Sequence, residues 1–267
     1  MNMNDCTALV VGATGGIGQA IVRQLAFRGA SLILVARHRE ALLSVAAQLA
    51  SSGSKVEVII ADLARDAAAI ARRALAIAGQ IDLVVNCAGT QTFGYSHAES
   101  ASDTERAFAV NVVGPIQLIN SLLPSMLSKG RGKIVNVGSI FGSIGYPCFA
   151  SYSGTKFALR GYSEALRREL AGSGIAVTYV APRYTRTAFN GDAVAKMATA
   201  LKMSQDRPER VARKVMAAIA ADSADSYLGW PEKFFVKVNA LFPGLVDSSL
   251  KRKLKVIRPF ALEAANR

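Results

Sequence analysis

Short apolar segments alternate with longer segments of helical periodicity along most of the chain, and this alternation constrains the fold more than any other feature. Such segments predict strands at residues 7–12, 31–36, 55–61, 81–86, 133–137, 175–180 and 226–229. The intervening segments predict helices at 16–28, 40–50, 67–78, 103–127, 151–171 and 208–221. Strands that are apolar throughout are typical of a parallel sheet covered on both faces. The sequence therefore predicts a single α/β, doubly wound Rossmann-type domain, with about seven parallel strands and ligands at their carboxyl ends.

The charge of the chain is strongly positive without a pattern that indicates nucleic acid. The formal charge is +13, spread along 267 residues, with its densest run at residues 251–255. Neither a zinc-finger pattern nor an aromatic-rich basic patch accompanies it, so we expect no nucleic-acid partner. Because hydrophobic residues make up 51% and charged residues 19%, the chain has enough apolar side chains for one buried core.

Cysteine and histidine are too few and too scattered for a structural framework. Cys6, Cys87 and Cys148 are far apart, and His38 and His97 are the only histidines. We therefore expect no metal site and no disulfide framework, as in a reducing compartment. The N-terminus lacks the pattern of a secretory signal, and no uncharged apolar run is expected to reach the roughly 20 residues of a spanning helix. A cytoplasmic location follows as an expectation.

A glycine-rich turn joins the first predicted strand to the first helix. It reads Gly12-Ala13-Thr14-Gly15-Gly16-Ile17-Gly18, with the spacing G-x-x-x-G-x-G. Glycines allow a tight turn and a close approach to a pyrophosphate, and the N-terminus of the following helix favours an anion. The turn predicts a dinucleotide site, although glycine-rich turns between strand and helix also occur for structural reasons alone.

The end of the second strand indicates which dinucleotide binds. A carboxylate here would bond the adenosine ribose hydroxyls of NAD, but the chain has Ala36 and Arg37 instead. A guanidinium pairs with a phosphate in a fork geometry, so Arg37 favours the 2′-phosphate of NADP. The alternative interpretation is a solvated arginine at the start of a helix.

Three polar residues form the strongest chemical signal. Tyr152 and Lys156 are four residues apart and share a helix face, and Ser139 ends the fifth strand. The carboxyl edge of the sheet brings them together. An ammonium group favours the phenolate, so Lys156 is predicted to lower the pKa of Tyr152 and make it a general acid or base. Ser139 would hold and polarise the substrate oxygen. A chance pair on an amphipathic helix is the competing interpretation.

From residue 7 to about residue 229 the chain resembles the short-chain dehydrogenase/reductase family. The resemblance rests on the glycine turn, Asp62, the run Asn86-Cys87-Ala88-Gly89, Asn111, and the set Ser139, Tyr152 and Lys156. It implies that Asp62 and Leu63 contact the adenine and that Asn86, Ala88 and Gly89 line the adenosine side. Lys156, beside Tyr152, would bind the nicotinamide ribose. Asn111 would help to hold a water that links Lys156 to solvent.

Three positions depart from the pattern of the family. Val11 stands where the family usually has threonine, and Cys87 stands where it usually has asparagine. After the sixth strand, Pro182, Thr185 and Thr187 match positions near the nicotinamide carboxamide and the pyrophosphate. Arg183 replaces the usual glycine in this segment, which leaves the local backbone and the lid above the site to be determined.

The loops above the sheet indicate an apolar substrate. The candidate segments are 91–100, 140–150 and 184–206, and the second contains Phe141, Ile144, Tyr146, Pro147 and Phe149. Packing of these side chains against a lid is an equally good interpretation. Residues 1–229 are predicted to form the cofactor-binding catalytic domain, and 230–267 an amphipathic, basic extension of it. We expect this extension to cover the cleft or form a subunit contact; peripheral membrane attachment is the less favoured alternative.

These observations predict an NADP-dependent oxidoreductase. It would transfer a hydride between NADPH and a carbonyl or alcohol, as a ketone or aldehyde reductase or an alcohol dehydrogenase. Two alternatives stay open: a cofactor-binding regulatory or scaffold protein without turnover, and redox-neutral epimerisation or dehydration at the same site. A homodimer or homotetramer is expected.

Overall fold

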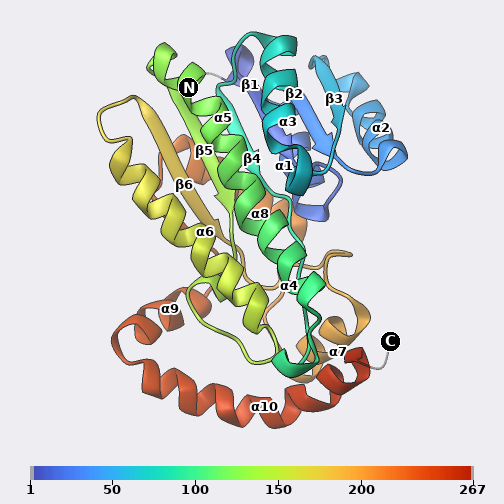
Figure 1. The fold of residues 1–267 in the computed structure, drawn as a ribbon, viewed down its shortest axis with the longest axis vertical. Coiled ribbons are helices and arrows are strands. Elements are labelled where there is room, and N and C mark those ends of the chain that lie inside the picture. Colours follow the sequence, from blue (N-terminus) through green and yellow to red (C-terminus); the bar gives the residue numbers. More distant parts are fainter. Residues whose placement is uncertain (1–2, 266–267) are drawn as a thin grey trace.

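A seven-stranded parallel sheet runs through the centre of the chain, in the order β3-β2-β1-β4-β5-β6-β7 (Figure 1). A computed structural model describes residues 3–265. The strands are β1 (Thr7–Val11), β2 (Ser31–Ala36), β3 (Val56–Ile60), β4 (Leu83–Asn86), β5 (Gly132–Val137), β6 (Ile175–Ala181) and β7 (Asp225–Tyr227). The strand order reverses between β1 and β4, which creates the crevice where open α/β sheets bind ligands. The predicted fold class is confirmed.

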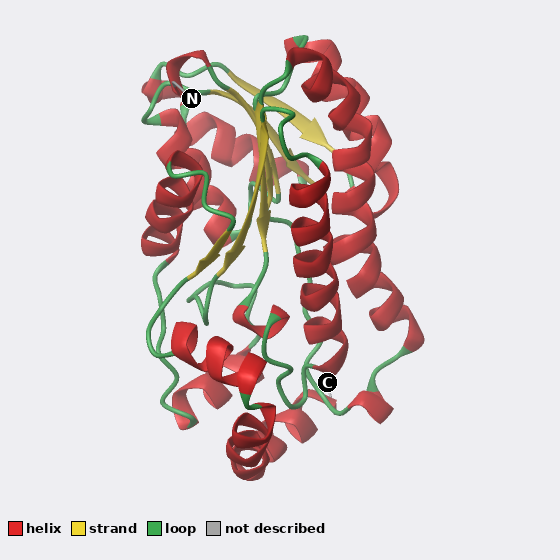
Figure 2. Ribbon diagram, turned by 90° about the vertical axis from the view of Figure 1, so that its left-hand side faces the viewer, coloured by secondary structure: helices red, strands yellow, loops and turns green. Residues whose placement is uncertain are grey.

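Helices cover both faces of the sheet, which Figure 2 shows nearly edge-on. Side chains of α1 (Gly16–Ala26), α2 (Arg39–Gln48) and α8 (Pro208–Ala220) fill the core on one face. Those of α3 (Leu63–Ala78), α5 (Gly114–Lys129) and α6 (Ala150–Glu169) fill the other. Apolar side chains alternate between the two cores along the central strands, as Leu9 and Val10 do in β1. Continuous apolar runs are therefore needed in the strands.

The helix predicted at 103–127 consists of three pieces. They are α4 (Ala101–Phe108), a π-helix at Ala109–Val113, and α5. Among the described residues, the combined segment Ala101–Lys129 is the one helix long and apolar enough to cross a membrane, because an 18-residue window within it has a mean hydropathy of 1.4. Residues 107–128 carry no charged side chain, which corrects the expectation that no such run exists. Half of the apolar window is buried, and the core helix of a folded domain has the same composition.

One helix begins four residues earlier than predicted, and one helix was not predicted. Helix α3 begins at Leu63 rather than at residue 67, because the Asp62 carboxylate accepts a hydrogen bond from the Ala64 N–H at 3.1 Å and caps the helix. Helix α7 (Asp192–Ala200) was not predicted. It lies within the segment 184–206, which the sequence indicated only as a substrate loop.

The C-terminal segment forms two helices beneath the carboxyl ends of the strands (Figure 1). They are α9 (Glu232–Leu241) and α10 (Pro243–Ala265). Pro243 begins α10, a position where its missing N–H and fixed φ are tolerated. Ile257 and Ala261 of α10 are fully buried against a cluster that includes Phe149 and Met197. The extension therefore covers the carboxyl end of the sheet, where the predicted catalytic residues lie.

Candidate active site

The glycine turn lies directly against the backbone that follows β4. Gly12 has a φ of +86°, and a Cβ there would lie 2.5 Å from the Ala88 nitrogen. Helix α1 starts at Gly16, and its N-cap residue Gly15 has no side chain that could bond the first N–H groups. These donors and the positive end of the helix dipole form a cradle for an anion. Thr187 packs against Gly16 from the opposite side.

A groove leads from this turn to the predicted catalytic residues. It is lined by twelve of the predicted site residues: Gly15, Gly16, Ile17, Gly18, Ala88, Gly89, Ser139, Tyr152, Lys156, Pro182, Thr185 and Thr187. The groove thus joins an anion cradle at one end to a proton-donating side chain at the other. This arrangement fits a nicotinamide dinucleotide, whose pyrophosphate would bind at the turn and whose nicotinamide would lie near Tyr152.

Seven other predicted residues lie behind or beyond the groove. Gly12 and Thr14 form the back of the turn, where the Thr14 carbonyl accepts a hydrogen bond from the Gln19 side chain at 2.8 Å. Arg37 is exposed at the end of β2 and forms no ion pair within residues 3–265. It lies two residues after Val35, whose carbonyl accepts hydrogen bonds from the N–H groups of Gly12 and Ala13. The end of β2 that precedes Arg37 therefore lies against the turn.

The predicted adenine contacts have structural roles in the described chain. Asp62 caps α3, and its carboxylate lies 3.6 Å from the guanidinium of Arg106. The Leu63 side chain is buried beneath α5, so any contact with a ligand would involve its backbone. Asn86 is buried in the sheet, where its amide donates to the Asn136 oxygen at 2.8 Å. Its side chain therefore links β4 to β5.

Asn111 braces the catalytic helix through a network of hydrogen bonds. Its side-chain oxygen accepts from the Thr90 N–H at 2.9 Å, and its amide donates to the Thr90 carbonyl at 2.8 Å. The same amide also donates to the Thr155 hydroxyl at 3.0 Å. Asn111 lies in the π-helix and is fully buried. The amide is thus fully engaged with protein groups, and π-helical turns of this kind often mark functional sites.

Ser139 is held by a residue that sequence reasoning missed. The hydroxyl of Tyr179, in β6, donates to the Ser139 carbonyl at 3.1 Å and accepts from the Ser139 N–H at 3.3 Å. The Tyr179 ring is fully buried and lies against Gly138 and Gly142, where a Cβ would collide with it. In the sequence, Tyr179 is one residue of an apolar strand, and nothing around it indicates that its hydroxyl holds Ser139. The two small glycines on either side of Ser139 were the available clue.

Tyr152 and Lys156 are both buried, and burial dominates their protonation. Burial raises the pKa of Tyr152 to about 12, while interaction with the Ser139 hydroxyl acts in the opposite direction. Burial also lowers the pKa of Lys156 to about 8. The Lys156 Nζ lies 5.7 Å from the centroid of the Tyr152 ring and donates to the Val137 carbonyl at 3.3 Å. Burial therefore outweighs the lowering of the Tyr152 pKa that the sequence predicted from Lys156, because desolvation of the phenol prevails.

Comparison with known proteins identifies the family. The sequence pattern of the family described as short chain dehydrogenase matches residues 6–198. The chain belongs to the short-chain dehydrogenase family. It is 30% identical over 258 residues to the Bacillus subtilis protein named Uncharacterized oxidoreductase YxnA, covering 94% of this chain and 72% of that protein. The chain is therefore an oxidoreductase with the fold of a family that binds nicotinamide cofactors.

Solved structures agree with this assignment. A short-chain dehydrogenase from Sphingobium yanoikuyae in complex with NADPH has a TM-score of 0.78 and 28% identity, covering 91% of this chain and 95% of that chain. A short chain dehydrogenase/reductase from Burkholderia phymatum in complex with NAD has a TM-score of 0.84, covering 92% and 96%. At 23% identity it shows the fold alone. The two cofactors among these structures leave the choice for this chain to its own residues.

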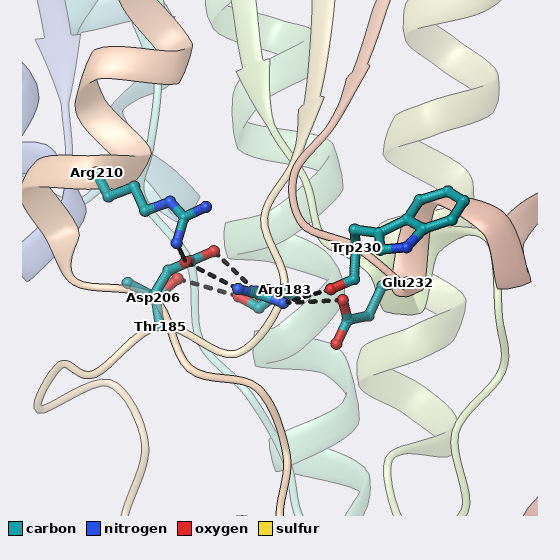
Figure 3. Close-up of polar contacts among 6 residues, drawn as sticks. All are labelled: Arg183, Thr185, Asp206, Arg210, Trp230 and Glu232. Carbon is teal, nitrogen blue, oxygen red and sulfur yellow. Dashed lines mark hydrogen bonds and ion pairs between the residues drawn. The ribbon is translucent and has the colours of Figure 1, made fainter.

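Arg183, where the short-chain dehydrogenase pattern usually has glycine, clamps the lid to the C-terminal extension (Figure 3). Its guanidinium forms two hydrogen bonds with the carboxylate of Asp206, at 2.9 and 3.1 Å. Asp206 ends the segment 184–206, which forms the lid. The guanidinium also donates to the Trp230 carbonyl and to Glu232, both at 3.1 Å. The Arg183 carbonyl accepts a hydrogen bond from the Thr185 hydroxyl at 3.0 Å. The substitution therefore fixes the lid geometry that the sequence left undetermined.

Proposed function

We propose that this short-chain dehydrogenase is an NADP-dependent reductase of an apolar ketone or aldehyde, which in reverse oxidises the corresponding alcohol. The observation that carries the proposal is the groove that joins the glycine turn to Ser139, Tyr152 and Lys156. When bound, the nicotinamide would supply or accept the hydride. The chain's own residues would hold the substrate oxygen and move the proton.

Each catalytic side chain has a distinct role in this proposal. The Ser139 hydroxyl donates a hydrogen bond to the substrate carbonyl oxygen and orients it. Tyr152, protonated because burial raises its pKa to about 12, donates its proton to that oxygen as the hydride reaches carbon. The charged Lys156 stabilises the phenolate left on Tyr152. Alcohol oxidation uses the same steps in reverse, and the alcohol proton then passes to the phenolate form of Tyr152.

The preference for NADP rests on Arg37. It is exposed and unpaired among the described residues, and it stands where a carboxylate would select NAD. The Sphingobium protein in complex with NADPH supports this choice by similarity. The apolar substrate is supported by the lining of the groove, which includes Phe141, Phe149 and Met197.

Cofactor use and turnover can be measured separately. Quenching of protein fluorescence is titrated with NADPH and with NADH, and we expect NADPH to bind at least about tenfold more tightly. NADPH consumption is then followed with a panel of aldehydes and ketones. Tighter binding of NADH would overturn the Arg37 argument. Binding of NADPH without consumption of any carbonyl would favour the scaffold or redox-neutral alternative.

The predicted homo-oligomer and cytoplasmic location stay predictions. Light scattering after size-exclusion chromatography measures the oligomeric state directly. Fractionation of cells that produce the full chain measures the location.

A further inference from the structure

A second cavity adjoins the catalytic groove. Its volume is about 410 Å³, within the range of ligand sites. It shares Ile140, Phe141 and Met203 with the groove that contains Tyr152. The ring of Phe141 forms the common wall, because it lies edge-on to Tyr152 at 6.3 Å and stacks on Tyr146 at 4.5 Å. The two spaces therefore share part of their lining, and a substrate chain that passes the Phe141 ring would enter the second one.

The cavity has an apolar interior and an amphipathic mouth. Its walls come from the loop after β5, the end of the lid, and helices α9 and α10; they include Ile144, Leu201, Val238, Val246 and Leu250. Glu232 is the one acidic residue among the described residues that line it, and its carboxylate is paired with Arg183 at 3.1 Å. Phe234, Phe235 and Leu245 lie at the outer end and are about half exposed, beside the exposed Lys253.

The geometry points to a substrate whose carbonyl or hydroxyl group lies at Ser139 and Tyr152 and whose long unbranched apolar chain occupies this second cavity. The inference rests on the proposed reductase function and names its substrate class. A sugar or a short polar substrate would leave the apolar walls hydrated. A hydrocarbon chain buries them, and each methylene added to the buried chain is worth about fourfold in binding.

The first test compares aldehydes of different chain length. We expect kcat/KM with NADPH to be at least about a hundredfold higher for dodecanal than for butanal. Ser249 lines the cavity and Ser248, next to it, faces solvent. In Ser249→Trp the indole fills the cavity and the preference for dodecanal collapses, whereas Ser248→Trp keeps it. Ser204→Trp, from the lid side, repeats the test if Ser249→Trp fails to fold.

A binding measurement separates this inference from the proposed reaction. cis-Parinaric acid, a fluorescent fatty acid, is titrated against the full chain and the same variants. We expect binding that Ser249→Trp and Ser204→Trp weaken at least about tenfold and Ser248→Trp leaves unchanged. Equal binding by all variants would overturn the cavity assignment. Chain binding without turnover of any aldehyde would instead contradict the proposed reaction and keep the cavity.

A different observation concerns the outer face of α9 and α10. Trp230, Leu241 and Phe242 have exposed fractions of 71%, 72% and 60%. Residues 230–262 also carry seven Lys and Arg against two acidic residues. Among these, Lys233 and Lys237 are exposed on α9, and the basic run 251–253 is exposed on α10. Exposed aromatic and aliphatic side chains are therefore surrounded by positive charge.

We infer that this face binds the surface of an anionic membrane. Aromatic side chains insert at the boundary between headgroups and acyl chains, and each Lys or Arg near the surface adds about fivefold in affinity. Charge argues against a second copy of the chain as the occupant, because pairing two such faces would bring their cations together. The cavity mouth, formed by Phe234 and Phe235, opens on this face.

Vesicle sedimentation tests the membrane inference without activity. We expect the full chain to pellet with vesicles containing phosphatidylglycerol and to stay in solution with phosphatidylcholine alone. The combined variant Trp230→Ser, Leu241→Ser and Phe242→Ser should lose at least about tenfold in partitioning. Phe27→Ser is the control, because Phe27 is 87% exposed but follows α1 and lies outside α9 and α10. Equal pelleting of the combined variant, or its conversion of a dimer to a monomer, would overturn the inference.

Discussion

The carboxyl edge of the sheet, with Asn111, Ser139, Tyr152 and Lys156, is the catalytic edge, and helices α9 and α10 form the C-terminal cover. The two regions differ in how their side chains are held in place. At the edge, Asn111 and Lys156 form hydrogen bonds with backbone groups of neighbouring segments, and the Ser139 backbone forms hydrogen bonds with the Tyr179 hydroxyl. In the cover, α9 and α10 bury one apolar face, and residues such as Leu241 remain exposed. Chemistry therefore depends on a rigid, internally bonded edge, whereas substrate and surface preferences depend on helices packed above it. Four experiments can break or sharpen this contrast.

Removal of the Tyr152 hydroxyl should have the largest effect. Tyr152→Phe keeps the ring packing against Phe149 but removes the proton that the edge supplies. We expect kcat for carbonyl reduction to fall by about a thousandfold, with NADPH affinity unchanged. Stopped-flow turnover and fluorescence titration measure the two quantities. Tyr146→Phe, on a neighbouring ring of the same aromatic cluster, is the control and should keep most of the activity. Full turnover by Tyr152→Phe would refute the proposed acid.

Loss of the Arg183 hydrogen bonds, which join the lid to the C-terminal cover, should lower the stability of the protein. Arg183→Met leaves Asp206, which is 3% exposed, without its bidentate partner. The exposed Arg210 then remains as an ion-pair partner of this carboxylate, so we expect the free energy of unfolding in urea to fall by at least about 2 kcal/mol, part of the about 3–5 kcal/mol that an uncompensated buried carboxylate costs. Arg210→Met removes the exposed partner of the same Asp206, at 3.3 Å, and should cost less than about 1 kcal/mol. If both variants lost the same free energy of unfolding, burial of the arginine would not decide how much its ion pair with Asp206 contributes to stability.

The edge was also the easier region to predict from sequence. Continuous apolar strands predict the sheet, and four-residue spacing on one helix predicts that Tyr152 and Lys156 share a face. Tyr179 was missed because an aromatic residue in a buried strand gives no sign that its hydroxyl holds Ser139. The π-helix at Asn111 was missed because its apolar pattern continues that of α4 and α5. In both cases, tertiary contacts that join distant segments decide the geometry.

The structure of the C-terminal cover was harder to predict, because an amphipathic pattern predicts a helix but not the surface against which its apolar face packs. The helical spacing of Phe234, Phe235 and Val238 predicts α9, but not which face is buried. The structure buries Val236 and leaves Phe234 and Phe235 partly exposed. Helix α7 is short and follows the turn-forming residues Asn190 and Gly191, so its sequence resembled a loop. The role of Arg183 needed both Asp206 and Glu232 to be located in space.

The protonation of Lys156 should set the alkaline limit of reduction. With a pKa of about 8, the ammonium is charged below that pH and neutral above it. Since Tyr152 stays protonated up to about pH 12, its proton remains available throughout this range. Loss of the positive charge weakens stabilisation of the phenolate, so kcat/KM for reduction should fall by about tenfold per unit above pH 8. Lys156→Arg, which stays charged, should lose this inflection, while Lys133→Arg at the other end of β5 should keep it. A flat wild-type profile to pH 10 would contradict the assignment.

The smallest effect is expected at Arg37, which differs from Arg183 in every respect that matters for ligand binding. The Arg183 side chain is only 9% exposed and is bonded to three protein groups, whereas Arg37 is exposed and unpaired among residues 3–265. Arg37→Ala should therefore leave the free energy of unfolding unchanged but weaken NADPH binding by about tenfold, through loss of the contact with the 2′-phosphate. NADH, which lacks that phosphate, should bind as before. Arg28→Ala, an exposed arginine after α1, controls for general charge and should change neither affinity. If Arg37→Ala weakened both cofactors equally, Arg37 would contribute only to the general positive field of the protein.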